Sequence, residues 1–120
     1  SALFYHLDKL KLSINKNEWE IIETRFSVLQ NNVQSNGFTN FIAMIVPDKS
    51  TVYKNYLLAP KQVFKSCLNL IPNKKEVNWL NIEKLMQKSI EEGEIDLYLP
   101  NDTHWGSEGY RVAAEAIIYK

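Results

Sequence analysis

The sequence has little of several residue types that mark specialised proteins. Cys67 is the single cysteine among 120 residues, so neither an internal disulfide nor a cysteine-rich metal cluster can form. The 14 basic and 14 acidic side chains cancel, which leaves no overall field to draw the chain to nucleic acid or an anionic membrane. No stretch approaches the roughly 20 apolar residues that cross a bilayer. We therefore expect a soluble domain with local binding sites and a buried free thiol.

Repeats, low-complexity tracts and Gly/Ser-rich linkers are also missing from the sequence. At this length the chain is expected to form a single α/β domain over residues 1–120, or the N-terminal part of a larger one. No secretory signal opens the chain, but it begins at Ser1 instead of methionine. The residues by themselves therefore leave the compartment undecided.

Apolar periodicity predicts helices that alternate with short strands. The first predicted helix ends at Gly37 and carries an apolar stripe formed by Trp19, Ile22, Phe26, Leu29 and Val33. "FTNFIAMIV", residues 38–46, predicts a strand buried on both faces that Pro47 closes. "ALFYH", residues 2–6, is a weak candidate for an edge strand.

The second half continues the alternation. A helix is predicted from Pro60, with Val63, Phe64, Cys67, Leu68 and Ile71 on one face. "EVNWLNI", residues 76–82, predicts a short extended piece, and a helix with Leu85, Met86 and Ile90 inward runs from about Glu83 to Gly93. "IDLYLP", residues 95–100, predicts another strand. The last predicted helix presents Tyr110, Ala113, Ala114, Ile117 and Ile118 on one side.

This order predicts an α/β fold, in which a small parallel sheet is flanked by helices in a flavodoxin-like three-layer sandwich. Only two strands are well marked, and two more are weak. Such a sheet is small for a doubly wound domain, so we expect that it is incomplete.

Asp102 and His104 form the most chemically informative pair. On extended backbone, side chains two residues apart leave the same face, which would set a carboxylate beside an imidazole. A carboxylate fixes the imidazole tautomer, and the second ring nitrogen can then take a proton from a hydroxyl nucleophile. The alternative is a polar turn, in which Asp102 caps the turn, Thr103 or Ser107 caps the helix, and His104 is partly buried. The residues alone leave both interpretations open.

Asp48, Lys49 and Ser50 follow the predicted strand of residues 38–46 and carry turn chemistry. Open α/β sheets hold their sites at the carboxyl ends of strands, so these three residues are candidates to border a site. Lys49 contacts an anionic or sugar substrate in one interpretation and is a solvated turn lysine in the other. The sequence predicts no cofactor and no metal site, since His6 and His104 have no clustered ligands around them.

Two stretches together resemble a known family. "VPDKSTVY", residues 46–53, and "DTHWGSEGYRVAAEAI", residues 102–117, resemble the SGNH hydrolase-like domains of the alginate O-acetyltransferase type. "ALFYH" is similar to a degraded form of that family's opening Trp-Leu-Phe-Tyr segment. The resemblance implies an SGNH-like fold and a serine-dependent O-acyl esterase or O-acetyltransferase that acts on polysaccharide or other carbohydrate esters. It also suggests an extracytoplasmic, periplasmic or cell-surface location.

By this resemblance Asp102 is the orienting carboxylate and His104 the general base. The family's serine lies downstream of the Asp-x-His segment, so we expect the nucleophile and the C-terminal part of the domain to be missing from this chain. An alternative is a small esterase that uses Ser50 as nucleophile, with Lys49 stabilising an oxyanion. Another is a non-catalytic carbohydrate-binding or scaffold module of the same fold. Ser107 is expected to cap the last helix, and Trp105 to pack into the core.

Overall fold

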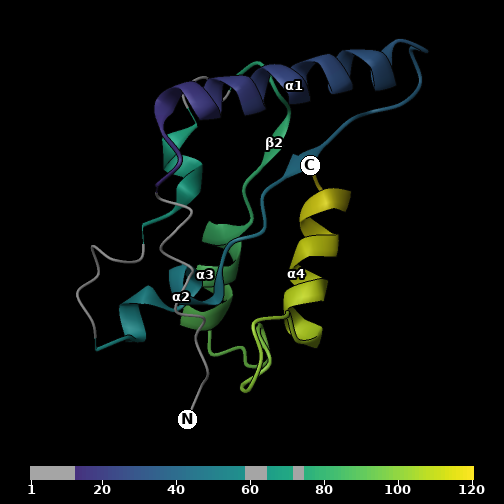
Figure 1. Ribbon diagram of the computed structural model, residues 1–120. Coiled ribbons are helices and arrows are strands. Elements are labelled where there is room, and N and C mark those ends of the chain that lie inside the picture. Colours follow the sequence, from purple (N-terminus) through teal and green to yellow (C-terminus); the bar gives the residue numbers. More distant parts are fainter. Residues whose placement is uncertain (1–12, 59–64, 72–74) are drawn as a thin grey trace.

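The computed structural model describes residues 13–58, 65–71 and 75–120. Within these ranges four helices and two short strands alternate along the chain (Figure 1). They are α1 (Lys16–Gln34), β1 (Ala43–Met44), α2 (Lys49–Val52), β2 (Trp79–Leu80), α3 (Glu83–Glu91) and α4 (Ser107–Ile118), with 3₁₀ turns at Lys54–Tyr56 (η2) and Cys67–Leu70 (η4).

Local sequence fixes both ends of α1. The Asn15 side chain accepts a hydrogen bond from the Glu18 amide at 3.0 Å, and the Glu18 carboxylate accepts one from the Asn15 amide at 2.8 Å. This reciprocal capping box satisfies two amides that a helix start leaves unpaired. Gly37 follows the helix with a φ of 75°, a left-handed conformation that glycine adopts without steric cost. The helix predicted to end at Gly37 is confirmed.

The two strands run parallel, with Ala43 opposite Trp79 and Met44 opposite Leu80. The predicted small parallel sheet is therefore confirmed, although each strand is shorter than the segment in which it was predicted. Side chains extend the connection, because the Asn78 amide group donates to the Phe41 carbonyl at 2.8 Å and the Asn78 backbone N–H donates to Gln30 of α1 at 2.7 Å. Asn78 thus joins the sheet to α1 through Gln30.

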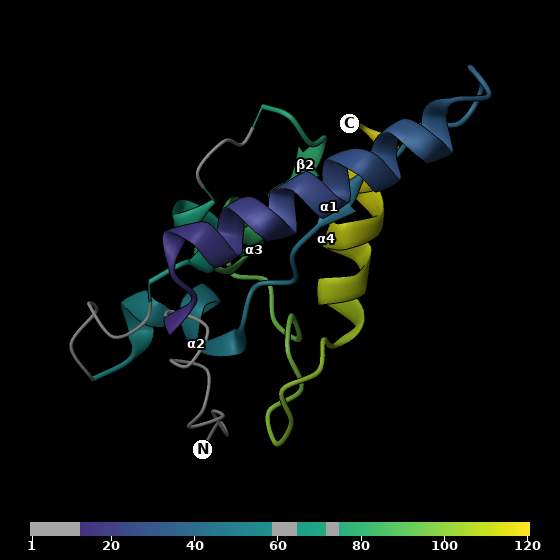
Figure 2. The ribbon, with the colours of Figure 1, turned by 45° about the horizontal axis from the view of Figure 1, so that its top comes forward.

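Alternate side chains of the strands enter two separate cores. Met44 and Leu80 belong to a cluster with α3 and α4, whereas Ile45 and Trp79 pack with Trp19 of α1. A strand sends successive side chains to opposite faces, so the sheet lies between α1 on one side and α3 with α4 on the other (Figures 1 and 2). The three-layer α/β arrangement predicted from the sequence is confirmed.

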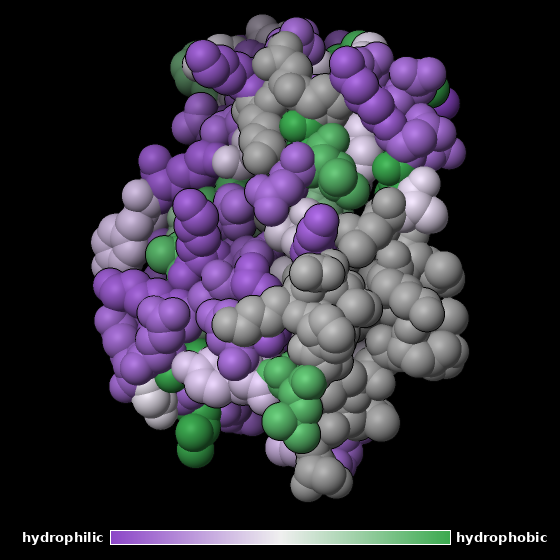
Figure 3. All heavy atoms as spheres, turned by 90° about the vertical axis from the view of Figure 1, so that its left-hand side faces the viewer, coloured by the Kyte–Doolittle hydropathy of each residue, from purple (hydrophilic) through white to green (hydrophobic). Residues whose placement is uncertain are grey.

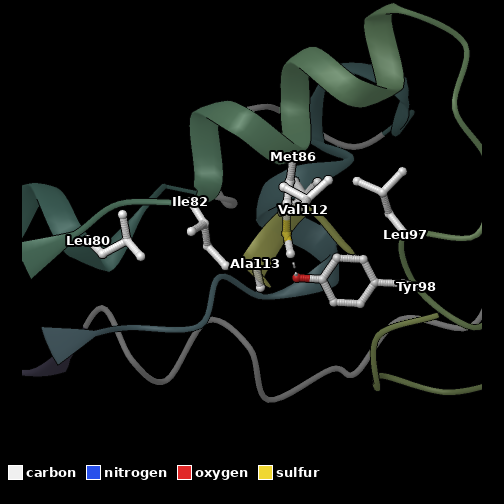
Figure 4. Packing of buried hydrophobic residues seen from close by; sticks show 8 residues of the cluster. Leu80, Ile82, Met86, Leu97, Tyr98, Val112 and Ala113 are labelled. Carbon is white, nitrogen blue, oxygen red and sulfur yellow. Dashed lines mark hydrogen bonds between the residues drawn. The ribbon is translucent and has the colours of Figure 1, made fainter. Parts of the chain in front are cut away.

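The larger core lies between the sheet, α2, α3 and α4. Its fully enclosed residues include Ile82 and Met86 around α3 and Leu97 in the segment before α4 (Figure 4). The Tyr98 hydroxyl is buried with them and donates a hydrogen bond to the Pro47 carbonyl at 2.5 Å. This bond ties the segment before α4 to the segment that follows β1.

The strand predicted over residues 95–100 is wrong. Leu97 and Tyr98 are buried as an apolar run should be, but Tyr98 makes only an isolated antiparallel bridge with Trp105. Asp96 has a φ of 66°, which breaks extended backbone. The segment therefore pairs with the residues that immediately follow it, and it does not join the sheet.

Three other expectations need correction or lie outside the described ranges. The predicted edge strand at residues 2–6 and the first half of the helix predicted from Pro60 fall outside those ranges. The described remainder of that helix is the short 3₁₀ turn at Cys67–Leu70. Cys67 is a buried thiol, as predicted.

Two helices bury narrower faces than their apolar residues predict. Leu85 of α3 is 43% exposed, while its neighbour Met86 is fully enclosed. In α4 the inward face is formed by Gly109, Val112 and Ala113. Tyr110, Ile117 and Ile118 are exposed, so the predicted apolar side of α4 is only partly the side that is buried. Leu29, in the predicted apolar stripe of α1, is likewise 47% exposed. Figure 3 shows one side of the molecule, where hydrophilic residues dominate and apolar residues lie in small groups.

Candidate functional site

The start of α4 is held by a residue from the preceding segment. The Asp96 carboxylate accepts hydrogen bonds from the Ser107 amide at 3.0 Å and from the Ser107 hydroxyl at 2.7 Å. Ser107 is the first helical residue and Gly106 occupies the capping position without a side chain. The prediction that Ser107 caps the helix through its own side chain is therefore wrong. Sequence reasoning missed Asp96 because its partner is 11 residues away.

Residues 99–104 form a closed loop between the large core and the contact of Asp96 with Ser107. The Leu99 amide donates to the His104 carbonyl at 3.0 Å, and the Gly106 amide donates to the Leu97 carbonyl at 3.0 Å. The Tyr98–Trp105 bridge lies between these two bonds. Both sides of the loop are thus fixed, and Asp102 and His104 lie within it.

Asp102 and His104 contact each other directly. Nδ1 of His104 lies 2.7 Å from Oδ1 of Asp102. The same oxygen accepts hydrogen bonds from the backbone amide of Thr103 at 2.6 Å and from that of His104 at 3.3 Å. The pair therefore forms in a turn and not on extended backbone. Asp102 caps its own turn, as in the polar-turn interpretation, and also bonds to the imidazole, as in the other. The partly buried position that the polar-turn interpretation gave to His104 is wrong, because its side chain is 75% exposed.

This geometry determines which ring nitrogen can react. A carboxylate is only an acceptor, so Nδ1 of neutral His104 carries the proton and Nε2 carries the lone pair. The hydrogen bond from His104, followed by that from the Thr103 amide, lowers the pKa of Asp102 below the ordinary aspartate range. The His104 side chain is 75% exposed. The arrangement can accept a proton from a group that approaches from solvent.

Lys49 is neither solvated nor open to a substrate. It is 3% exposed, and its ammonium group donates to the carbonyls of Leu99 at 2.7 Å, Pro100 at 3.0 Å and Asp102 at 3.1 Å. Burial lowers the pKa of Lys49, and the nearby Asp102 charge opposes that shift. Lys49 follows the carboxyl end of β1, so the Asp102–His104 loop does lie at that end of the sheet.

The other two residues of the predicted turn are structural neighbours of Lys49. Asp48 lies at the N-terminal boundary of α2, where its carbonyl accepts the amides of Thr51 and Val52 at 3.0 Å. Ser50 lies within α2 and is 1% exposed. That burial does not favour Ser50 as a nucleophile, which must meet a substrate.

A shallow groove of about 170 Å³ lies beside the imidazole. It is lined by Val46, Thr103, His104, Trp105 and Tyr110. The Trp105 and Tyr110 rings meet edge to face with their centroids 5.6 Å apart. Trp105 also packs against the large core, as predicted, whereas Tyr110 is 60% exposed. An aromatic surface therefore adjoins the candidate base.

The described residues contain neither a metal site nor a membrane-spanning helix. Residues 13–58, 65–71 and 75–120 contain no group of three or more His, Cys, Asp or Glu side chains placed to hold a metal ion. No helix in the described part of the chain has both the length and the apolar character to cross a membrane.

Comparison with known proteins agrees with this fold and with the quoted motifs. A family model described as "SGNH hydrolase-like domain, acetyltransferase AlgX" matches residues 3–119. No curated protein and no solved structure matches the chain. The family match covers nearly the whole chain, including both segments that meet at Lys49 and the Asp102–His104 loop. The chain therefore belongs to the family of SGNH hydrolase-like domains of the acetyltransferase AlgX.

Proposed function

We propose that this domain supplies the general base and its orienting carboxylate to a serine-dependent O-acetyl transfer or ester hydrolysis. The observation that carries the proposal is the 2.7 Å contact between Nδ1 of His104 and Asp102, on an imidazole that is 75% exposed. A base must be held in one tautomer and must still reach its substrate. His104 meets both requirements.

The reaction follows from the position of the lone pair. Nε2 of His104 takes the proton of a serine hydroxyl while the serine oxygen attacks the acetyl carbonyl carbon. The imidazolium then returns the proton to the departing alkoxide, which leaves an acetyl-serine. In the second half His104 deprotonates water or a sugar hydroxyl, which attacks the acetyl-serine and regenerates the serine. Exclusion of water from the groove would decide between hydrolysis and transfer.

The serine is proposed to come from outside residues 1–120. Among the described residues that line the groove beside His104 there is no serine. Ser50, the alternative nucleophile within the chain, is buried in α2 at 1% exposure. A hydroxyl delivered over the groove by another segment would meet Nε2 from the exposed side.

The proposed acceptor is a carbohydrate, in an extracytoplasmic polysaccharide. Family membership supports acetyl transfer, and the exposed Tyr110 ring beside His104 offers a flat apolar surface of the kind that packs against a sugar ring. The groove is shallow and open, which suits an extended polymer better than a small enclosed metabolite.

The test compares this chain with the native polypeptide that carries it. Hydrolysis of an aryl acetate and transfer of its acetyl group to an oligosaccharide are measured for both. We expect activity only in the native polypeptide, and His104→Gln should lower kcat by several orders of magnitude. Lys84→Gln, an exposed change on α3, is the control.

Three outcomes would refute the proposal. Full activity of residues 1–120 that disappears in Ser50→Ala would place the nucleophile inside the chain. A loss of less than tenfold in the His104→Gln polypeptide would show that the imidazole is not the base. If the native polypeptide binds oligosaccharide but never cleaves an ester, the domain is a binding module.

A further inference from the structure

Lys49 is an unusual residue for this fold to bury. Lysine side chains are among the least often enclosed, and a buried charge is costly unless hydrogen bonds replace its water. Here the side chain is 3% exposed, and three carbonyl oxygens lie within 3.1 Å of Nζ. An ammonium group has three donors. The three carbonyls match all of them, so Lys49 has no donor left for a substrate.

The three carbonyls belong to one loop, which also has short-range hydrogen bonds of its own, such as that from the Asp102 amide to the Leu99 carbonyl at 3.3 Å. They come from Leu99, Pro100 and Asp102, all within the segment that the Tyr98–Trp105 bridge closes. The carbonyl of Asp102 bonds to Lys49 while the Asp102 carboxylate bonds to His104. A single residue, Asp102, therefore connects the buried ammonium of Lys49 to the imidazole of His104, through its carbonyl on one side and its carboxylate on the other.

We propose that Lys49 is a positioning residue for the Asp102–His104 pair. Its ammonium draws the three carbonyls inward, which turns the Asp102 side chain outward to meet Nδ1 of His104. Lys49 itself never touches the reacting atoms. This inference deepens the proposed function and depends on it, since a positioned imidazole has a purpose only if the imidazole is the base.

The test measures the His104 tautomer directly in this chain. Lys49→Met removes the ammonium and keeps an unbranched side chain of similar length. Lys54→Met is the matched control, because Lys54 pairs with Glu83 at 3.6 Å and has no hydrogen bond to the 99–102 loop. The imidazole ¹⁵N chemical shifts are recorded at alkaline pH and below the melting temperature of each variant.

The unaltered chain and Lys54→Met should both show the Nδ1–H tautomer. In Lys49→Met the ratio of Nδ1–H to Nε2–H should fall by about tenfold, the change expected when a charge-assisted hydrogen bond loses its alignment. General destabilisation would not change the tautomer of the molecules that remain folded. An unchanged ratio in folded Lys49→Met would overturn the inference.

A second measurement needs no substitution and covers the case in which Lys49→Met does not fold. In the unaltered chain the Lys49 ammonium protons should exchange slowly with water and show couplings across the hydrogen bonds to the carbonyl carbons of residues 99, 100 and 102. Lys88, which is 70% exposed, is the internal reference. We call the three hydrogen bonds from the Lys49 ammonium to the carbonyls of Leu99, Pro100 and Asp102 the Lys49 clamp. Exchange of the Lys49 protons as fast as that of the Lys88 protons would refute this clamp. These readouts are independent of catalysis, so an inactive native polypeptide would refute the proposed function alone.

Discussion

The Asp96 carboxylate accepts two hydrogen bonds from Ser107, one from the backbone amide at 3.0 Å and one from the hydroxyl at 2.7 Å. Through this contact a residue with left-handed backbone caps a helix that begins 11 positions later. The contact also closes the base of the segment that carries Asp102 and His104. The stability of α4 and the position of the candidate site are thereby linked.

Replacement of Asp96 should therefore destabilise the domain. Asp96→Ala removes the cap and places a residue with low tolerance for positive φ at 66°. We expect a melting temperature several degrees lower, measured by circular dichroism. Asp96→Asn retains an acceptor and the tolerance for this backbone, so it should lose less. Equal losses in the two variants would contradict the capping role.

The same carboxylate should give a pH-dependent contribution to stability. Hydrogen bonds from Ser107 hold the pKa of Asp96 below its ordinary range. The unfolded chain therefore takes up this proton at a higher pH than the folded chain, so the stabilisation is complete above the unfolded pKa and is lost as the pH falls through the folded pKa. The difference in melting temperature between the unaltered chain and Asp96→Asn should persist at neutral pH and shrink below about pH 4. A difference that is constant with pH would contradict this assignment.

Gly109→Ala should reverse the usual effect of this change in a helix. Alanine normally stabilises a helix interior by about 1 kcal/mol relative to glycine. A Cβ at Gly109, however, would overlap the backbone carbonyl oxygen of Leu97 and press on the Trp105 ring. We expect a lower free energy of unfolding by urea denaturation. A more stable Gly109→Ala chain would show that α4 does not pack this closely on the segment before it.

Adjacent residues of α3 should differ sharply on truncation. Met86 is fully enclosed in the large core, whereas Leu85 is 43% exposed. Met86→Ala should cost roughly 2–5 kcal/mol, because it removes buried surface and leaves a cavity. Leu85→Ala should cost about 1 kcal/mol or less. Urea denaturation of the two variants measures both, and similar losses would mean that α3 is rotated relative to the core.

Asp102→Asn should separate catalysis from binding in the native polypeptide. The amide can donate as well as accept, so it no longer enforces the Nδ1–H tautomer of His104. We expect kcat to fall by roughly 10²–10⁴-fold with little change in KM. Glu91→Gln, which removes an exposed carboxylate from α3, is the control. A rise in KM alone would indicate that Asp102 holds substrate instead of orienting the base.

The features that the sequence predicted correctly depend on local patterns. The apolar stripe from Trp19 to Val33, followed by Gly37, identifies α1 and its end, and the apolar run at residues 38–46 identifies the strand that contains Met44. The Asp102–His104 contact is also local, since it joins residues two positions apart. Such features need no knowledge of the rest of the chain.

The features that sequence reasoning missed depend on distant partners. Lys49 was expected in solvent or against a substrate, because nothing near it in the chain reveals three carbonyls about 50 positions away. The apolar run at residues 95–100 predicted a strand, yet Leu97 and Tyr98 reach the core from a segment that Asp96 bends. Burial alone does not specify which backbone groups will pair.

The Lys49 clamp also bears on the order in which the domain folds. Its donor and its acceptors are 50 to 53 positions apart, so the clamp forms only after a long stretch of chain has closed, at an entropic cost that helices do not incur. Helix α1 can begin from its own sequence, because its capping box joins residues three positions apart. The loop that holds His104 should therefore be ordered late during folding and should open early under mild denaturant, which hydrogen exchange at the amides of residues 99–104 would detect while the helices remain protected.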